Sequence, residues 1–162
     1  MNKKDTVVFD LDGTLLDTLE DLKNSVNYAM TQCGYPEHTL DEVRRYVGNG
    51  ILLLMQRAIP EGKNDPNFDK AFTLFKEHYG KHCNDTSKPY AGIMELLHTL
   101  KENNIKIAIV SNKADFAVKE LNAIYFKDLI LVAIGEKESE GIRKKPAPDT
   151  VIEALKQLGS TA

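Results

Sequence analysis

The sequence predicts an α/β fold in which a parallel sheet is interrupted by a long helical insertion. Three short apolar runs, rich in β-branched residues, have the length of strands that are buried on both faces. Amphipathic helical patterns alternate with these runs, as in folds built from strand–helix–strand units. The connection over residues 17–88 is far longer than the others, and nothing in it has the pattern of a strand. Together these features indicate a Rossmann-like core with a second, helical domain inserted in it.

The expected core elements follow from these runs and periods. We expect strands at residues 6–9, 105–110 and 129–134, where the apolar runs lie. The helices between and after them are marked by apolar stripes, which are Ile93, Leu96, Leu97 and Leu100; Ala117, Leu121 and Ile124; and Val151, Ile152, Leu155 and Leu158. Gly159 follows the last stripe at the position where a helix typically ends.

The insertion reads as four helices. The first covers about residues 18–33 and ends at Gly34, and Thr39 with Glu42 forms a capping box that opens the second. The third covers residues 51–59, and a stripe of aromatic and small residues marks the fourth, namely Phe68, Ala71, Phe72, Phe75 and Tyr79. We therefore expect a core made of residues 1–16 and 89–162, and a helical cap made of residues 17–88.

Composition excludes several classes of protein. The chain has 21 basic and 24 acidic side chains and a formal net charge of −3, which argues against a nucleic-acid partner. No apolar run is long enough to span a membrane or to serve as a signal peptide. Cys33 and Cys83 have no metal-ligand spacing and are expected to be reduced thiols. We expect a cytoplasmic protein.

Polar residues follow each expected strand at the sheet edge where α/β proteins bind ligands. Asp10 and Asp12 follow the first strand, Ser111 and Asn112 the second, and Lys145 lies in the loop after the third. Two carboxylates, a hydroxyl at an expected helix N-terminus and a lysine are the parts of a Mg²⁺-assisted phosphoryl transfer through an aspartyl phosphate.

Each of these residue types has a physical role in that chemistry. Asp10 would attack phosphorus and share the cation, and Asp12 would protonate the leaving oxygen and later activate water. Gly13 would permit a sharp turn. Ser111 and the Asn112 amide would hold a phosphate oxygen at the start of a helix, and Lys145 would supply the remaining positive charge.

The segment FDLDGT over residues 9–14 resembles the first motif of the haloacid-dehalogenase-type phosphatases, hhhhDxDGT. Ser111 matches the second motif of that family, and Lys145 in Lys-Pro-x-Pro matches the third. Within the family, the sequences at residues 47–50, 111–113 and 145–149 look most like those of the phosphoglycolate phosphatases. The resemblance covers essentially the whole chain.

The resemblance implies a role for each matching residue. Asp10 is the nucleophile, and Asp12 is the general acid and base, with its backbone carbonyl as a second Mg²⁺ ligand. Ser111 and Lys145 bind phosphate. The remaining residues expected to contact phosphate or substrate are Gly13, Thr14 and Asn112 in the core, and Gly48 and Asn49 in a cap loop that inspects the rest of the substrate. Arg44, Arg45 or Lys113 is a further candidate to meet a substrate carboxylate.

The family's fourth motif, an acidic pattern such as GDxxxD, does not occur in this sequence after the third. The carboxylates of that motif complete the magnesium site. Without them, Asp10 and one backbone carbonyl are few ligands for the ion. The strand that carries it would flank the first strand, which would otherwise have an unpaired edge. We therefore expect the 162 residues to be a truncated phosphatase with reduced stability and weak or no turnover.

The leading functional expectation is a Mg²⁺-dependent phosphatase of a small phosphorylated metabolite, with 2-phosphoglycolate, cleaved to glycolate, as the best single substrate. A sugar-phosphate mutase resembling β-phosphoglucomutase shares the fold, cap and motifs, but returns the phosphoryl group to a sugar. A receiver-type phosphoacceptor module fits less well, because its acceptor lies on an interior strand. The last alternative is a catalytically dead remnant that only binds a ligand. The sequence does not indicate an oligomeric state.

Overall fold

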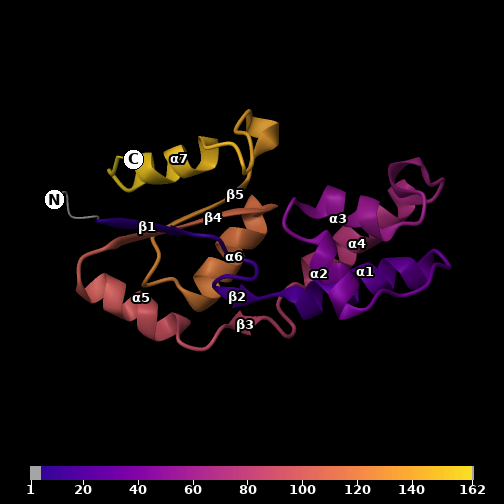
Figure 1. The fold of residues 1–162 in the computed structure, drawn as a ribbon, viewed down its shortest axis with the longest axis horizontal. Coiled ribbons are helices and arrows are strands. Elements are labelled where there is room, and N and C mark those ends of the chain that lie inside the picture. Colours follow the sequence, from indigo (N-terminus) through magenta and orange to yellow (C-terminus); the bar gives the residue numbers. More distant parts are fainter. Residues whose placement is uncertain (1–4, 162) are drawn as a thin grey trace. The chain divides into compact units, whose positions relative to one another are not determined.

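The computed structural model describes residues 5–161 and contains a parallel sheet of three strands (Figure 1). The strands are β1 (Thr6–Phe9), β4 (Lys106–Ala114) and β5 (Val132–Glu136), in the order β1-β4-β5. Two very short strands, β2 (Leu16–Asp17) and β3 (Lys88–Pro89), pair with each other where the chain enters and leaves the insertion. The chain divides into two compact units, Asp17–Lys88 and the residues on either side of that segment.

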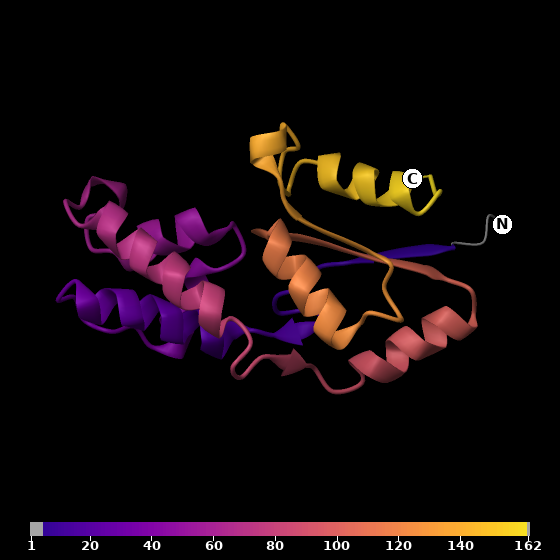
Figure 2. The same ribbon diagram turned by 180° about the vertical axis from the view of Figure 1, so that it is seen from behind.

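Helices cover both faces of the three-stranded sheet. Helices α5 (Ile93–Glu102) and α6 (Asp115–Tyr125) lie on one face, and α7 (Asp149–Gln157) lies on the other (Figure 2). Alternate residues of β4 face opposite ways, as the pleat of a strand requires. Thus Ile107 and Ile109 belong to the cluster beneath α5 and α6, while Ala108 and Val110 pack with Ala154 of α7. The predicted α/β class with a parallel core is confirmed.

Two strand boundaries differ from the sequence prediction. Strand β4 continues to Ala114, so Ser111 and Asn112 lie within a strand rather than at the start of a helix. The pairing of β4 with β5 shifts register between Val110 and Ala114, and this irregularity extends the strand past the end of the apolar run. Strand β5 begins three residues later than predicted, because the amides of Leu129 and Ile130 both bond to the carbonyl of Phe126 in a turn.

The apolar stripes are also wider than the buried faces of the helices. Leu97 and Leu121 are fully buried, but Leu96, Ile124 and Ile152 are exposed. A stripe in the sequence covers more of the helix surface than the sheet beneath it can bury, so residues at its margin remain in contact with solvent. Within the described residues, β1 pairs with β4 alone and is therefore an edge strand with half-buried side chains.

The helical unit consists of four α-helices around a separate apolar cluster. They are α1 (Leu19–Gln32), α2 (Leu40–Tyr46), α3 (Ile51–Ala58) and α4 (Phe68–His82). Thr39 and Glu42 form the predicted capping box at the start of α2. A short 3-10 helix, η1 (Gly62–Asn64), precedes α4, and a second, η2 (Glu138–Glu140), follows β5 in the other unit. None of the helices in the described part of the chain combines the length and the apolar character needed to cross a bilayer.

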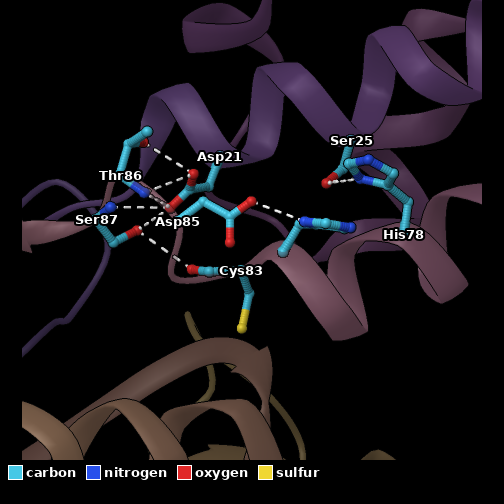
Figure 3. A network of polar contacts seen from close by, with 8 residues as sticks. Asp21, Ser25, His78, Cys83, Asp85, Thr86 and Ser87 are labelled. Carbon is cyan, nitrogen blue, oxygen red and sulfur yellow. Dashed lines mark hydrogen bonds and ion pairs between the residues drawn. The ribbon is translucent and has the colours of Figure 1, made fainter.

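A buried carboxylate fixes the segment that follows α4 (Figure 3). Asp21 of α1 accepts hydrogen bonds from the amides and hydroxyls of Thr86 and Ser87, at distances between 2.7 and 3.1 Å. The Ser87 hydroxyl also bonds to the Cys83 carbonyl at 3.2 Å. Because these donors satisfy an otherwise costly buried charge, the end of the insertion is anchored to its first helix.

Candidate active site

Asp10 and Lys145 meet at the carboxyl end of the sheet although 135 residues separate them. The Lys145 Nζ donates to Asp10 Oδ1 at 2.8 Å and to the Val110 carbonyl at 2.9 Å. The second bond ties the ammonium to the end of the regular part of β4. The side chains of Asp10 and Lys145 are 43% and 30% exposed, so an anion in solution can reach both.

Asp12 forms a second ion pair beside the first. The Lys113 Nζ donates to Asp12 Oδ1 at 2.8 Å. Asp12 is 27% exposed at its side chain, whereas the Lys113 side chain is only 3% exposed. A buried lysine therefore holds, by a hydrogen bond, a carboxylate that is itself partly exposed.

Local sequence explains why the two carboxylates share this surface. Leu11 lies between them and is completely buried in the core beneath α5 and α6, which turns its two neighbours away from that core. Gly13 has a φ of 76°, a left-handed conformation that glycine adopts without steric cost, and its amide bonds to the Leu16 carbonyl at 2.9 Å. The predicted sharp turn at Gly13 is confirmed, and Thr14 follows in the same turn.

Ser111 and Asn112 lie in the irregular part of β4 and bond to the neighbouring backbone. The Ser111 hydroxyl accepts the Lys113 amide at 3.1 Å and the residue is 2% exposed. Asn112 pairs with Lys145 through its whole side-chain amide: its Nδ2 donates to the Lys145 carbonyl at 3.1 Å, and its Oδ1 accepts the Lys145 amide at 2.9 Å. These contacts replace the helix N-terminus expected from the sequence, and they fix the backbone from which the Lys145 side chain extends.

The loop that carries Lys145 is also fixed at both of its ends. Arg143 forms two side-chain bonds with the Asp149 carboxylate, at 2.9 and 2.7 Å, and its amide adds a third at 3.1 Å. The Arg143 guanidinium, with help from that amide, holds the pKa of Asp149 below its ordinary value. Because Asp149 is the first residue of α7, this pair closes the loop against the helix.

The four charged side chains of the site balance one another. Two carboxylates, Asp10 and Asp12, face two ammonium groups, Lys113 and Lys145, so a dianionic phosphate would need a further cation for neutrality. No group of three His, Cys, Asp or Glu side chains within residues 5–161 could hold a metal. The Asp10 carboxylate and the Asp12 backbone carbonyl are nevertheless hard oxygen donors, and Mg²⁺ often takes only one or two carboxylates beside water and substrate phosphate. These donors are therefore of the type that Mg²⁺ prefers, although the protein supplies only two of them.

The expected cap residues lie in the other unit. Gly48 and Asn49 connect α2 to α3, and Gly48 has a φ of 110°, which favours glycine. Arg44 pairs with Asp41 within α2. A contact of any of these residues with substrate stays a prediction.

Sequence reasoning placed Lys113 among possible partners of a substrate carboxylate and did not connect it to Asp12. The signal available was its position two residues after Ser111, at the same end of the sheet as Asp12. Likewise, the pairing of the Asn112 side chain with the Lys145 backbone was not expected, and the predicted contact of Asn112 with phosphate stays a prediction. Both links depend on how the irregular end of β4 bends, which periodicity does not reveal.

Comparison with known proteins shows which family the chain resembles. Residues 7–162 match the family model described as haloacid dehalogenase-like hydrolase. A phosphoglycolate phosphatase of Thiobacillus denitrificans is 32% identical over 159 residues, which cover 94% of this chain and 69% of that protein. A phosphoglycolate phosphatase of Aquifex aeolicus is 32% identical over 157 residues, covering 94% of this chain and 70% of its own length.

Solved structures agree with the sequence comparisons. The structure of a candidate phosphoglycolate phosphatase from Lactobacillus delbrueckii subsp. bulgaricus has a TM-score of 0.91 and 33% sequence identity, covering 98% of this chain and 75% of that one. The comparisons confirm the expected fold and, as the class of enzyme, a phosphoric monoester hydrolase. The chain belongs to the haloacid dehalogenase-like hydrolase family.

Proposed function

We propose that this enzyme hydrolyses the phosphate ester of a small metabolite, with 2-phosphoglycolate as the best single substrate. The proposal rests on two ion pairs at one edge of the sheet. Lys145 Nζ lies 2.8 Å from Asp10 Oδ1, and Lys113 Nζ lies 2.8 Å from Asp12 Oδ1. A partly exposed carboxylate held beside an ammonium group is suited to attack a phosphoryl group, while a second carboxylate lies two residues away.

In the first step, a carboxylate oxygen of Asp10 forms a bond to phosphorus while the bond from phosphorus to the ester oxygen breaks. Asp12, which takes up a proton from solvent as the substrate binds, gives that proton to the departing oxygen, so glycolate leaves as an alcohol. Lys145 and the Ser111 hydroxyl bind the phosphate oxygens and offset their negative charge. The product of this step is an aspartyl phosphate on Asp10.

In the second step, the Asp12 carboxylate takes a proton from water. The water oxygen forms a bond to phosphorus while the bond from phosphorus to Asp10 breaks, which releases inorganic phosphate and restores the free carboxylate. Asp12 thus acts first as an acid and then as a base, and the second step returns it to the protonated form in which it entered the first.

Mg²⁺ is part of the proposal because the charges of the site balance before a dianion arrives. The Asp10 carboxylate and the Asp12 backbone carbonyl would hold the ion, and when bound it supplies positive charge that offsets the phosphate oxygens. With only these protein ligands, we expect weak affinity for Mg²⁺ and correspondingly weak turnover by the 162 residues.

The choice of 2-phosphoglycolate rests on the names of the relatives and on the sequence of the cap loop. Both curated relatives described above are phosphoglycolate phosphatases. We propose that Gly48 and Asn49 of the helical unit inspect the glycolate end of the substrate, and that this unit serves as the cap.

The test is release of inorganic phosphate from 2-phosphoglycolate, followed with Mg²⁺ present and with EDTA in its place. We expect release that depends on Mg²⁺ and yields one glycolate for each phosphate. If the enzyme instead moves the phosphoryl group of a sugar phosphate to another hydroxyl without releasing inorganic phosphate, the result favours a mutase. Ligand binding by a folded chain without any release, at high enzyme and Mg²⁺ concentrations, would contradict the proposal.

A further inference from the structure

We propose that Lys113 is a positioning residue that holds the Asp12 carboxyl in the orientation needed to protonate the leaving oxygen. This inference rests on the proposed function, because it assigns Lys113 a role through Asp12 in that reaction. The observation behind it is the 2.8 Å bond from the Lys113 Nζ to Asp12 Oδ1.

The burial of Lys113 makes this bond an orienting contact. Its side chain is only 3% exposed, so its long stem is confined by surrounding atoms instead of moving in solvent. Asp12 is 27% exposed and can meet a substrate, but an exposed carboxyl with no fixed partner samples several side-chain rotamers. A confined ammonium group that bonds to one carboxyl oxygen selects one of those rotamers.

The backbone at Lys113 is fixed as well. Its amide donates to the Ser111 hydroxyl at 3.1 Å, which bends the chain locally over two residues. This bend coincides with the register shift between β4 and β5, and irregularities of this kind often re-aim a side chain next to an active site. The irregular strand end therefore directs Lys113 toward Asp12 while Asn112, its neighbour, pairs with Lys145.

Two other roles for Lys113 make different predictions. A residue that only stabilises the fold would affect all substrates of the enzyme alike. A residue that binds the phosphate group would weaken the affinity for inorganic phosphate. A residue that acts through the general acid matters most when the leaving group is a poor one, since a good leaving group departs without receiving a proton.

The experiment compares kcat/KM for two substrates in wild-type protein and in Lys113→Met. The alkyl ester 2-phosphoglycolate needs a proton at its leaving oxygen, whereas 4-nitrophenyl phosphate releases a stabilised anion. The inhibition constant of inorganic phosphate is measured in parallel. Lys119→Met is the matched control, because Lys119 forms an exposed ion pair with Asp115 within α6.

We expect Lys113→Met to lower kcat/KM for 2-phosphoglycolate by about 10- to 100-fold and that for 4-nitrophenyl phosphate by less than about threefold, in line with general-acid effects. The inhibition constant of phosphate should not change, and Lys119→Met should behave as wild type. Circular dichroism confirms that each variant is folded. If Lys113→Met does not fold, Lys113→Gln, which keeps a polar side chain, is expected to show the same unequal loss.

Equal losses on both substrates, or weaker inhibition by phosphate, would overturn the role of Lys113 while the proposed function stands. Wild-type protein that releases phosphate from neither substrate would overturn the proposed function and this inference with it. With 2-phosphoglycolate alone, a lower kcat at unchanged KM supports the positioning role, and a raised KM at unchanged kcat contradicts it.

Discussion

At the scale of single residues, the candidate site depends on side chains that hold other side chains. Lys145 reaches Asp10 because its own backbone is clamped by Asn112, and the loop that carries it is closed by Arg143 and Asp149. Sequence motifs predicted the outer members of this network, Asp10 and Lys145, since their residue types indicate the chemistry directly. The clamp formed by Asn112 could not be predicted, because an asparagine side chain pairs with any exposed peptide group and its partner lies 33 residues away.

Replacement of Asn112 by Ala tests this clamp. The change removes two hydrogen bonds to the Lys145 backbone, so we expect the free energy of unfolding to fall by about 1–3 kcal/mol. The inhibition constant of inorganic phosphate should rise as well, because the Lys145 ammonium is no longer held beside Asp10. Urea denaturation and phosphate inhibition measure the two effects.

Asn103→Ala is the control for that variant. Asn103 makes one exposed side-chain bond to the Thr99 carbonyl at the end of α5, and its removal should change the stability by less than about 0.5 kcal/mol. Equal effects of Asn112→Ala and Asn103→Ala on both measurements would show that the pairing with Lys145 has no special role.

At the scale of elements, periodicity predicted the helices well and the strand ends poorly. Helices α1 to α4 follow the expected order, and the capping box at Thr39 begins α2 as predicted. The apolar run at residues 105–110 marks only the apolar part of β4, whereas the strand continues through polar residues, two of them buried, to Ala114. Strand length here is set by the neighbouring strand and the register shift, and neither is encoded in a local pattern.

The contact between β5 and α6 gives a prediction about Gly135. A Cβ at this position would lie 2.4 Å from the Asp115 Cα and 2.6 Å from the Lys113 carbonyl oxygen, and backbone atoms cannot yield as side chains do. We expect Gly135→Ala to lower the free energy of unfolding by about 1–3 kcal/mol or more, and to reduce activity because Lys113 is displaced.

Gly80→Ala, inside α4, is the matched control, because no atom within 4 Å would contact the new Cβ. Alanine is the better helix former, so this change should be neutral or stabilising by up to about 1 kcal/mol. The free energies of unfolding of both variants are measured in urea. Wild-type stability in Gly135→Ala would contradict the close approach of β5 and α6.

Helix α4 also predicts a dependence of stability on pH. Burial lowers the pKa of His78 from its ordinary value of 6.5, and the neighbouring His82, whose ring stacks on it at 4.3 Å, lowers it further. The unfolded chain therefore binds this proton more readily than the folded one. The contribution of the neutral His78 ring to the stability of the folded chain is therefore complete above pH 6.5. It is lost as the pH falls toward the lower pKa of His78 in the folded state.

We expect His78→Gln to show a smaller loss of Tm than wild type when the pH is lowered from about 7.5 to about 5. Glutamine keeps a polar group near Ser25, the hydrogen-bond partner of His78 seen in Figure 3. The exposed His98 provides the control, since His98→Gln should retain the wild-type loss. If the Tm of His78→Gln falls with pH as much as that of wild type, His78 is not the cause of the pH dependence.

At the scale of the whole molecule, the chain forms two units with separate apolar cores. The fold class and the family were predictable, because short motifs at strand ends occur in a fixed order along a long chain. The magnesium site was predicted less completely. The Asp10 carboxylate and the Asp12 carbonyl stay predicted donors, and no cluster of three ligand side chains forms among the described residues. Metal affinity depends on the number and geometry of donors, which the first motif alone does not supply.

The central claim is that Asp10 performs the chemistry, and the measurement that tests it most directly is phosphate release from 2-phosphoglycolate by wild type and Asp10→Asn at saturating Mg²⁺. The amide has nearly the shape of the carboxylate but cannot form the phosphoryl bond, so we expect Mg²⁺-dependent release in wild type and none above background in a folded Asp10→Asn variant. Release at the wild-type rate by Asp10→Asn would contradict the account.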